Sequence, residues 1–138
     1  MLIAIPAESD PAEGRVAATP ETVKKFVGLG ADVKVQAGAG LKSGIPDQEY
    51  ALAGAAITPD ALATVKDADI VLRVRRPGAA DIAGAKQGAA VVAIMDPYGN
   101  IDALTSLAAA GVCAFAIIFF FLARPVFSSA PPSWVAGW

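Results

Sequence analysis

The sequence contains no histidine and only one cysteine among its 138 residues. Without histidine, the chain lacks the commonest general acid-base group and the commonest metal ligand. The single cysteine, Cys113, cannot form a disulfide within the chain. Because it lies in an apolar run, we expect a buried, inert thiol, and we predict no metal site.

Positive charge is also scarce. Eleven Lys and Arg residues against 13 Asp and Glu give a formal net charge of −2. A nucleic-acid-binding protein needs a basic surface for the phosphate backbone, so we predict no nucleic-acid partner. The hydrophobic fraction is 55%, but the apolar run at residues 112–123 is shorter than the roughly 20 residues of a membrane-spanning helix. We interpret this run as a central buried strand that extends past its natural end.

Short apolar runs alternate with helical patterns. Thr19 suits a helix N-cap and Pro20 a first helical position, and Asp47 is a candidate cap for a second helix. Three helices end at a glycine followed by a small residue and a strand, which is how α/β units are joined. Strands are expected at residues 2–5, 32–36, 56–57, 70–74, 89–95 and from 112, and helices at 20–29, 47–53, 59–66 and 101–110, with a short turn or helix at 81–86.

Buried strands separated by helices indicate an α/β fold. Crossovers of this kind are right-handed and join parallel strands. We therefore predict a Rossmann-like three-layer domain with a mostly parallel sheet.

Three glycines, Gly38, Gly40 and Gly44, follow the second expected strand, as they do in phosphate-binding loops. Their spacing is G-x-G-x-x-x-G rather than G-x-G-x-x-G, and no helix begins directly after them. We therefore expect a structural turn here and no dinucleotide site.

Arg15 and Arg73 are the candidate substrate-binding residues. Ligands of open α/β sheets lie at the carboxyl ends of strands, where both arginines are expected. A guanidinium can hold a carboxylate or phosphate through two parallel hydrogen bonds. The alternatives are a surface pair of Arg15 with Glu8, Asp10 or Glu13, and a solvated cluster of Arg73 with Arg75 and Arg76.

The order and spacing of several motifs resemble the N-terminal domain shared by alanine dehydrogenases and the alpha subunit of proton-translocating NAD(P) transhydrogenase. The resemblance covers residues 1–116. It implies a part of the NAD(H)-binding subunit, in an assembly that transfers hydride between NAD and NADP. The motifs are Val16-Ala-Ala-Thr-Pro-Glu-Thr-Val-Lys-Lys25, Gly28-Leu-Gly-Ala31, Ala37-Gly-Ala-Gly40, Ala68-Asp-Ile-Val-Leu72, Ala110-Gly-Val112 and Ala114-Phe-Ala116.

The resemblance also implies that the dinucleotide fingerprint lies outside this domain. We therefore expect this chain alone neither to bind NAD tightly nor to turn over. Its implied partners are the membrane and NADP-binding subunits. Its implied location is cytoplasmic, peripheral to the inner membrane when assembled.

The two branches of the family imply different site residues. In alanine dehydrogenases the arginine that matches Arg15 contacts the substrate carboxylate, a lysine stands in place of Arg73, and a catalytic histidine stands near Asp96. This chain has no histidine, and residues 97–100 (Pro-Tyr-Gly-Asn) are similar to the Pro-x-x-Asn segment of transhydrogenases. Two alternatives stay open: an alanine dehydrogenase-like amino-acid oxidoreductase fragment, and a non-catalytic binding or assembly module that dimerises through residues 117–122.

The resemblance ends near residue 116. Residues 117–138 form a divergent apolar strand and a tail rich in Pro and Ser, where the family carries a Pro-Arg-Ile segment. Here Arg124 and Pro125 stand in reversed order. The abrupt change suggests a frameshift or truncation near residue 117, which the nucleotide sequence can test.

Overall fold

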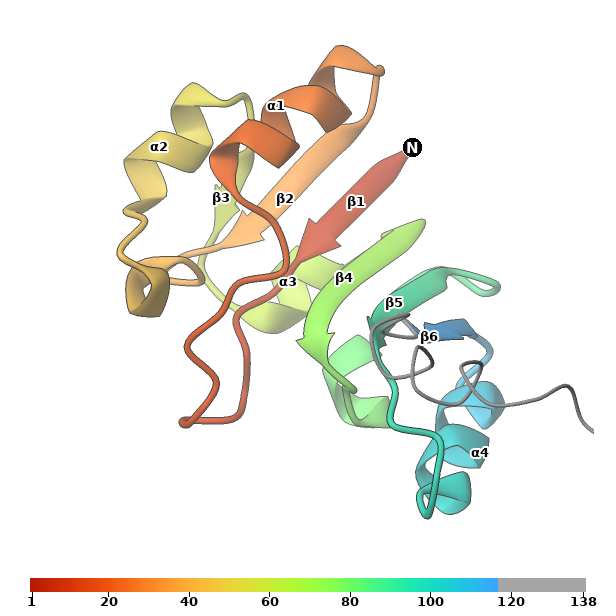
Figure 1. Cartoon of the computed structure of the whole chain (residues 1–138). Coiled ribbons are helices and arrows are strands. Elements are labelled where there is room, and N and C mark those ends of the chain that lie inside the picture. Colours follow the sequence, from red (N-terminus) through yellow and green to blue (C-terminus); the bar gives the residue numbers. More distant parts are fainter. Residues whose placement is uncertain (117–138) are drawn as a thin grey trace, which may run out of the picture.

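The computed structural model describes residues 1–116, which form a twisted sheet with helices on both faces (Figure 1). The strands are β1 (Leu2–Ile5), β2 (Asp32–Gln36), β3 (Ala56–Thr58), β4 (Ile70–Arg75), β5 (Ala90–Ile94) and β6 (Cys113–Ala116). The helices are α1 (Pro20–Gly28), α2 (Asp47–Leu52), α3 (Ala61–Val65) and α4 (Ile101–Ala109), with short 3-10 turns η1 (Leu41–Ser43) and η2 (Ala79–Ile82). No helix within residues 1–116 has both the length and the apolar character needed to cross a membrane.

The strands are ordered β3-β2-β1-β4-β5-β6, and every pair among them is parallel. The predicted Rossmann-like parallel sheet is confirmed. From the centre of the sheet, β1, β2 and β3 follow one another toward one edge. β4, β5 and β6 follow one another toward the opposite edge. In open α/β sheets this reversal opens a crevice at the carboxyl ends of the two central strands, where ligands bind.

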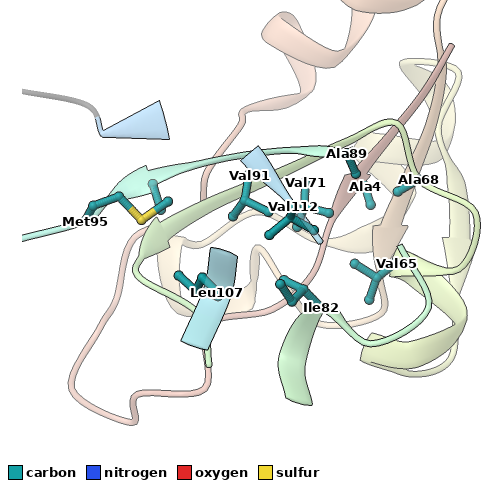
Figure 2. Close-up of a cluster of buried hydrophobic side chains, with 11 residues drawn as sticks. Ala4, Val65, Ala68, Val71, Ile82, Ala89, Val91, Met95, Leu107 and Val112 are labelled. Atoms are coloured by element: carbon teal, nitrogen blue, oxygen red, sulfur yellow. The ribbon is translucent and has the colours of Figure 1, made fainter. Parts of the chain in front are cut away.

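Two hydrophobic clusters lie on opposite faces of the sheet and give the three predicted layers. One contains Val23 of α1 and Tyr50 of α2, packed against Ile3, Ile5, Val33 and Val35. The other contains Val65 of α3 and Leu107 of α4, packed against Val71, Val91 and Met95 (Figure 2). The alternation of side chains along each strand separates the two sets.

The start of α1 follows the sequence signals. Thr19 is the N-cap, Pro20 is the first helical residue, and the Thr19 side chain accepts a hydrogen bond from the N–H of Thr22. The expected capping role of Asp47 is wrong. Pro46 takes the cap position of α2, and the Asp47 carboxylate accepts the N–H of Gly38 at 2.9 Å instead.

The structure also contradicts the interpretation of residues 112–116. In the described sheet β6 is an edge strand with β5 as its neighbour. Cys113 is exposed rather than buried, and Phe115 is 57% exposed. A central strand and an edge strand can have equally apolar sequences. An apolar run therefore does not show how much of the strand other elements cover. The predicted extension at 117–122 lies outside the described residues.

Gly40 is a position where only a residue without a side chain fits. A Cβ placed there would lie 2.7 Å from the carbonyl oxygen of Ile45 and 2.8 Å from the Tyr50 ring. The Tyr50 ring is fully buried, and its hydroxyl donates to the carbonyl of Ala18 at 2.8 Å. The glycine loop is therefore packed against the protein's own core.

We predict that Gly40→Ala lowers the free energy of unfolding by about 1–3 kcal/mol, the usual cost of overpacking. Gly28→Ala is the matched control, because a Cβ there meets nothing within 4 Å and alanine favours the helix by about 0.5–1 kcal/mol. Urea denaturation of both variants tests this. Equal stability of the two variants would contradict the packing argument.

Candidate functional site

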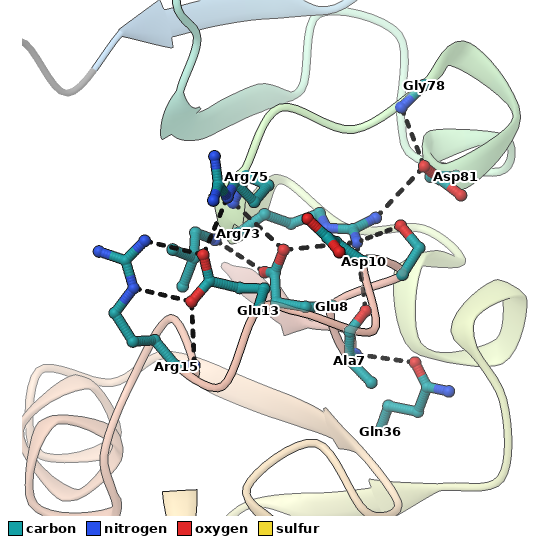
Figure 3. Close-up of polar contacts among 12 residues, drawn as sticks. Ala7, Glu8, Asp10, Glu13, Arg15, Gln36, Arg73, Arg75, Gly78 and Asp81 are labelled. Atoms are coloured by element: carbon teal, nitrogen blue, oxygen red, sulfur yellow. Dashed lines mark hydrogen bonds and ion pairs between the residues drawn. The ribbon is translucent and has the colours of Figure 1, made fainter. Parts of the chain in front are cut away.

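The candidate site lies at the carboxyl ends of β1 and β4, where the strand order reverses. The loop between β1 and α1, residues 6–19, meets residues 73–75 at the end of β4 (Figure 3). The loop is held on its other side by Lys42, whose ammonium donates to the carbonyls of Asp10, Pro11 and Glu13. Ser43 donates to the carbonyl of Gly14 at 2.7 Å.

Glu8 joins this loop to β4. Its carboxylate accepts the backbone N–H of Val74 at 2.8 Å and of Arg75 at 3.2 Å. The pairing of β4 with β5 shifts register between Leu72 and Arg75. Glu8 therefore supplies acceptors to backbone donors at the irregular end of the strand.

Arg73 is buried, with 3% of its side chain exposed, so the alternative of a solvated cluster is wrong for this residue. Its guanidinium lies 3.7 Å from Glu8 and 3.4 Å from Asp81 of η2. It also donates to the carbonyl of Ala7 and to the Ser9 hydroxyl. Among residues 1–116, its buried Nε has no hydrogen-bond partner. Alternation along β4 places Arg73 on the same face of the sheet as buried Val71.

Glu13 is shared by two exposed arginines. Arg15 donates to its two oxygens through Nε at 2.8 Å and Nη2 at 2.7 Å. The Nε of Arg75 donates to the second oxygen at 2.9 Å. The Glu13 side chain is 4% exposed, whereas Arg15 is 58% and Arg75 56% exposed. One shielded carboxylate thus holds two guanidiniums at the surface.

These contacts lower the pKa of Glu13 to about 2. The largest cause is the side-chain hydrogen bond from Arg15, followed by the backbone N–H of Arg15, and burial opposes both. The same pairing raises the pKa of Arg15. Glu13 is therefore an anion at neutral pH, and it organises charge rather than accepting a proton.

The polar groups at the end of β5 are hydrogen-bonded to one another and to Arg76, which follows β4. Arg76 donates to the carbonyl of Met95 at 2.6 Å, and the Asn100 amide donates to the carbonyl and carboxylate of Asp96. Asp96 has a positive φ of 42°. Tyr98 at the tip of this turn is 89% exposed.

The glycine loop does not fit a dinucleotide. The N–H of Gly38 is bound to Asp47, and the space beside Gly40 is filled by Ile45 and Tyr50. A phosphate-binding loop needs its N–H groups and its glycine faces open to the ligand. We therefore place no reaction step at this loop.

The structure joins Arg15 and Arg73 into one region through residues that the sequence analysis did not select. Glu8 and Glu13 were considered only as surface partners of Arg15, and Arg75 only as part of a solvated cluster. A usable signal was present: three acids in the loop after one strand and three arginines at the end of another. Parallel strands bring such residues to one edge of the sheet.

Residues 4–120 match the family described as "Alanine dehydrogenase/PNT, N-terminal domain". The chain belongs to this family. The first portion of the divided NAD(P) transhydrogenase alpha subunit of Rhodospirillum rubrum is 38% identical over 122 residues, which are 85% of this chain and 32% of that protein. The alanine dehydrogenase of Halomonas elongata is 40% identical over 88 residues, 64% of this chain and 24% of that protein. The chain thus spans about a third or less of the length of these relatives.

Solved structures give the same family. The transhydrogenase from Sinorhizobium meliloti is 54% identical, with a TM-score of 0.79 over 84% of this chain and 34% of that one. An L-alanine dehydrogenase is 27% identical, with a TM-score of 0.78 over 84% of this chain and 32% of that one. The two branches share the fold to the same degree, and they differ in how much sequence they share with this chain.

We predict that Arg73→Met destabilises the protein by about 3–5 kcal/mol, because it leaves the buried Glu8 carboxylate without its cation. Arg75→Gln is the control at the neighbouring exposed position, where the loss of one ion pair costs about 1 kcal/mol or less. Free energies of unfolding from urea denaturation test the difference. A loss for Arg73→Met no larger than that for Arg75→Gln would show that Arg73 is not a buried structural cation.

The Glu13 pKa predicts an acid-sensitive component of stability. Because the folded pKa is about 2 and the ordinary value is 4.5, ionised Glu13 stabilises the fold above pH 4.5. That contribution is lost as pH falls from 4.5 toward 2. The advantage in melting temperature of the wild type over Glu13→Gln should therefore shrink over this range. Glu21→Gln, which breaks an exposed ion pair with Lys25, is the control measured over the same pH range.

Proposed function

We propose that this chain provides the N-terminal part of the NAD(H)-binding subunit of a proton-translocating NAD(P) transhydrogenase, which transfers hydride between NAD(H) and NADP(H). One observation carries the proposal. The two solved structures match this chain with nearly equal TM-scores. The sequence identity to the transhydrogenase structure, 54%, is twice the 27% identity to the alanine dehydrogenase structure. Residues 1–116 are the family domain in this proposal, and residues 117–138 a divergent segment.

In this proposal the chain belongs to a larger assembly. Its partners are the membrane and NADP-binding subunits, and its place is the cytoplasmic side of the inner membrane. Dimerisation through residues 117–122 stays a separate hypothesis, which concerns residues outside the described range. The nicotinamide cofactors carry the hydride chemistry, while protein groups orient them and exclude water.

The two candidate arginines have different proposed roles. Arg15 presents a guanidinium that is more than half exposed, so it can contact an anionic group of substrate. Arg73 is enclosed by Glu8 and Asp81. We propose that Arg73 does not touch substrate and instead positions the loop between β1 and α1, which does.

An alanine dehydrogenase-like function is the second candidate, favoured by the relative in Halomonas elongata. Amino-acid oxidation requires a group that removes a proton from the substrate nitrogen or from water. At the end of β5 this chain has Asp96, whose carboxylate is held by Asn100, and no histidine. A non-catalytic assembly module is the third candidate, and it predicts association without any ligand.

A chimera tests the first two candidates against each other. Residues 1–116 replace the corresponding segment of the Rhodospirillum rubrum alpha subunit, assembled with the other subunits of that enzyme. We expect hydride transfer from NADH to an NADP analogue within about tenfold of the parent. The unmodified parent is the positive control, and alanine-dependent reduction of NAD is measured in parallel. A folded chimera with alanine oxidation and no transhydrogenation would reverse the assignment.

We also predict that the chain alone binds NADH no more tightly than millimolar, because its glycine loop is closed against its own core. Isothermal titration calorimetry of the full 138-residue chain measures this. The parent alpha subunit serves as the positive control. Micromolar binding by the chain alone would overturn the view that the dinucleotide site lies elsewhere.

A further inference from the structure

We propose that the peptide bond between Asp96 and Pro97 is a site of self-cleavage, in which the Asp96 carboxylate attacks its own main-chain carbonyl. The bond lies in the exposed turn between β5 and α4. The proposal is independent of the transhydrogenase function, because cleavage needs no cofactor or partner subunit and involves only this turn and water.

The first argument is the backbone conformation of Asp96. Its φ of 42° lies in the left-handed region, which is unfavourable for a residue that carries a side chain. A residue that precedes proline is restricted further, because the proline ring clashes with it and favours an extended backbone. Asp96 thus has two unfavourable constraints beside one bond, and cleavage of that bond releases both.

The second argument is the pair of donors on the scissile carbonyl. The Asp96 carbonyl oxygen accepts a hydrogen bond from Nη1 of Arg76 at 3.2 Å and from the Asn100 side-chain amide at 3.2 Å. Attack on a carbonyl carbon moves negative charge onto this oxygen, and donors that are already in place stabilise that charge. Arg76 also donates to the carbonyl of Met95 at 2.6 Å, which keeps its guanidinium beside the oxygen.

The third argument is the position of the nucleophile. The Asn100 amide that contacts the Asp96 carbonyl also donates to Oδ2 of the Asp96 carboxylate at 3.2 Å. It therefore holds both groups of Asp96 toward a common donor, and Oδ1 is the attacking atom. Attack within one residue closes a small ring, and preorganised intramolecular reactions of this kind are much faster than their bimolecular counterparts.

The reaction balances with water as its co-reactant. Oδ1 of Asp96 bonds to its main-chain carbonyl carbon, the carbon–nitrogen bond to Pro97 breaks, and the nitrogen takes a proton from solvent. The products are a cyclic anhydride at Asp96 and a free secondary amine at Pro97. Water then adds to the anhydride and gives a side-chain and a terminal carboxylate, while the protons of that water return to solvent.

The bond between Asp10 and Pro11 is a matched control within the same chain. The Asp10 carbonyl also accepts from two donors, the Lys42 ammonium at 3.3 Å and the N–H of Glu13 at 3.1 Å. Asp10 is outside the left-handed region, however. Its carboxylate accepts the N–H of Ala12 at 2.9 Å rather than sharing a donor with its own carbonyl. The two bonds therefore differ in backbone strain and in the position of the nucleophile.

Intact-mass spectrometry of the full chain measures both cleavages during incubation at about pH 5, where the acid-sensitive part of the stability is kept. Cleavage at the proposed site gives fragments 1–96 and 97–138, and cleavage at the control bond gives 1–10 and 11–138. In the folded chain we expect the Asp96–Pro97 bond to break at least roughly tenfold faster than the Asp10–Pro11 bond. In urea, which removes the fold, the two rates should be similar.

Variants test the assigned roles. Asp96→Asn lacks the attacking carboxylate and should not be cleaved at this bond. Arg76→Gln removes the cationic donor and should slow cleavage at least roughly tenfold. Lys24→Gln is the control, since it removes one exposed cation from α1, far along the chain from this turn. It should leave the rate unchanged.

Two results with the unmodified chain would overturn the proposal: equal rates at the two bonds in the folded state, or a rate at Asp96–Pro97 no faster than in urea. Cleavage of Asp96→Asn at this bond, or equal rates in Arg76→Gln and Lys24→Gln, would also contradict it. Circular dichroism establishes that each variant is folded. Failure here leaves the chimera experiment untouched, because hydride transfer does not depend on this bond being broken.

Discussion

The carboxylate of Glu8 holds together the two halves of the sheet at their carboxyl end. β1 contributes Glu8 through the loop that follows it, and β4 contributes the N–H groups of Val74 and Arg75. The hydrophobic clusters on the two faces determine that β1 and β4 lie side by side. They do not determine where β4 ends or how its last residues point. Glu8 does so, and it thereby separates a buried arginine, Arg73, from an exposed one, Arg75.

This separation explains why three arginines in four residues have different environments. A guanidinium that enters the interior loses its hydration, and the loss is compensated only when carboxylates and hydrogen-bond acceptors surround it. Arg73 has Glu8, Asp81, Ser9 and the Ala7 carbonyl, yet within the described part of the chain its Nε has no hydrogen-bond partner. Arg75 stays 56% exposed, although the Glu13 carboxylate that its Nε contacts is only 4% exposed. The loop after β1 thus supplies one shielded acid to a buried arginine and another to exposed arginines.

The sequence signals were reliable where one residue type has one physical role. Thr19 before Pro20 marked the start of α1, and the apolar runs marked the position of each strand within one or two residues. They were unreliable where neighbours in space decide. Asp47 suited a cap, but Gly38 offered it a different donor. Cys113 and Arg73 were assigned from their neighbours in the chain, whereas their exposure depends on which side of a strand other elements cover. No sequence pattern around Arg75 indicated its environment, since its ion pair depends on Glu13, which is far away in the chain.

The chemistry of this edge suits a reaction that needs positioned charge and no proton. Hydride transfer between two nicotinamides moves a hydrogen with its electron pair from one ring to the other, and no protein group has to accept or donate a proton. Oxidation of an amino acid does require such a group. Glu13 at this edge has a pKa of about 2, which is far too low for a base at neutral pH. Glu8 is committed to backbone N–H groups and Arg73, and Asp96 to Asn100. The three acids Glu8, Glu13 and Asp96 thus have structural roles. This supports the transhydrogenase branch over the alanine dehydrogenase branch.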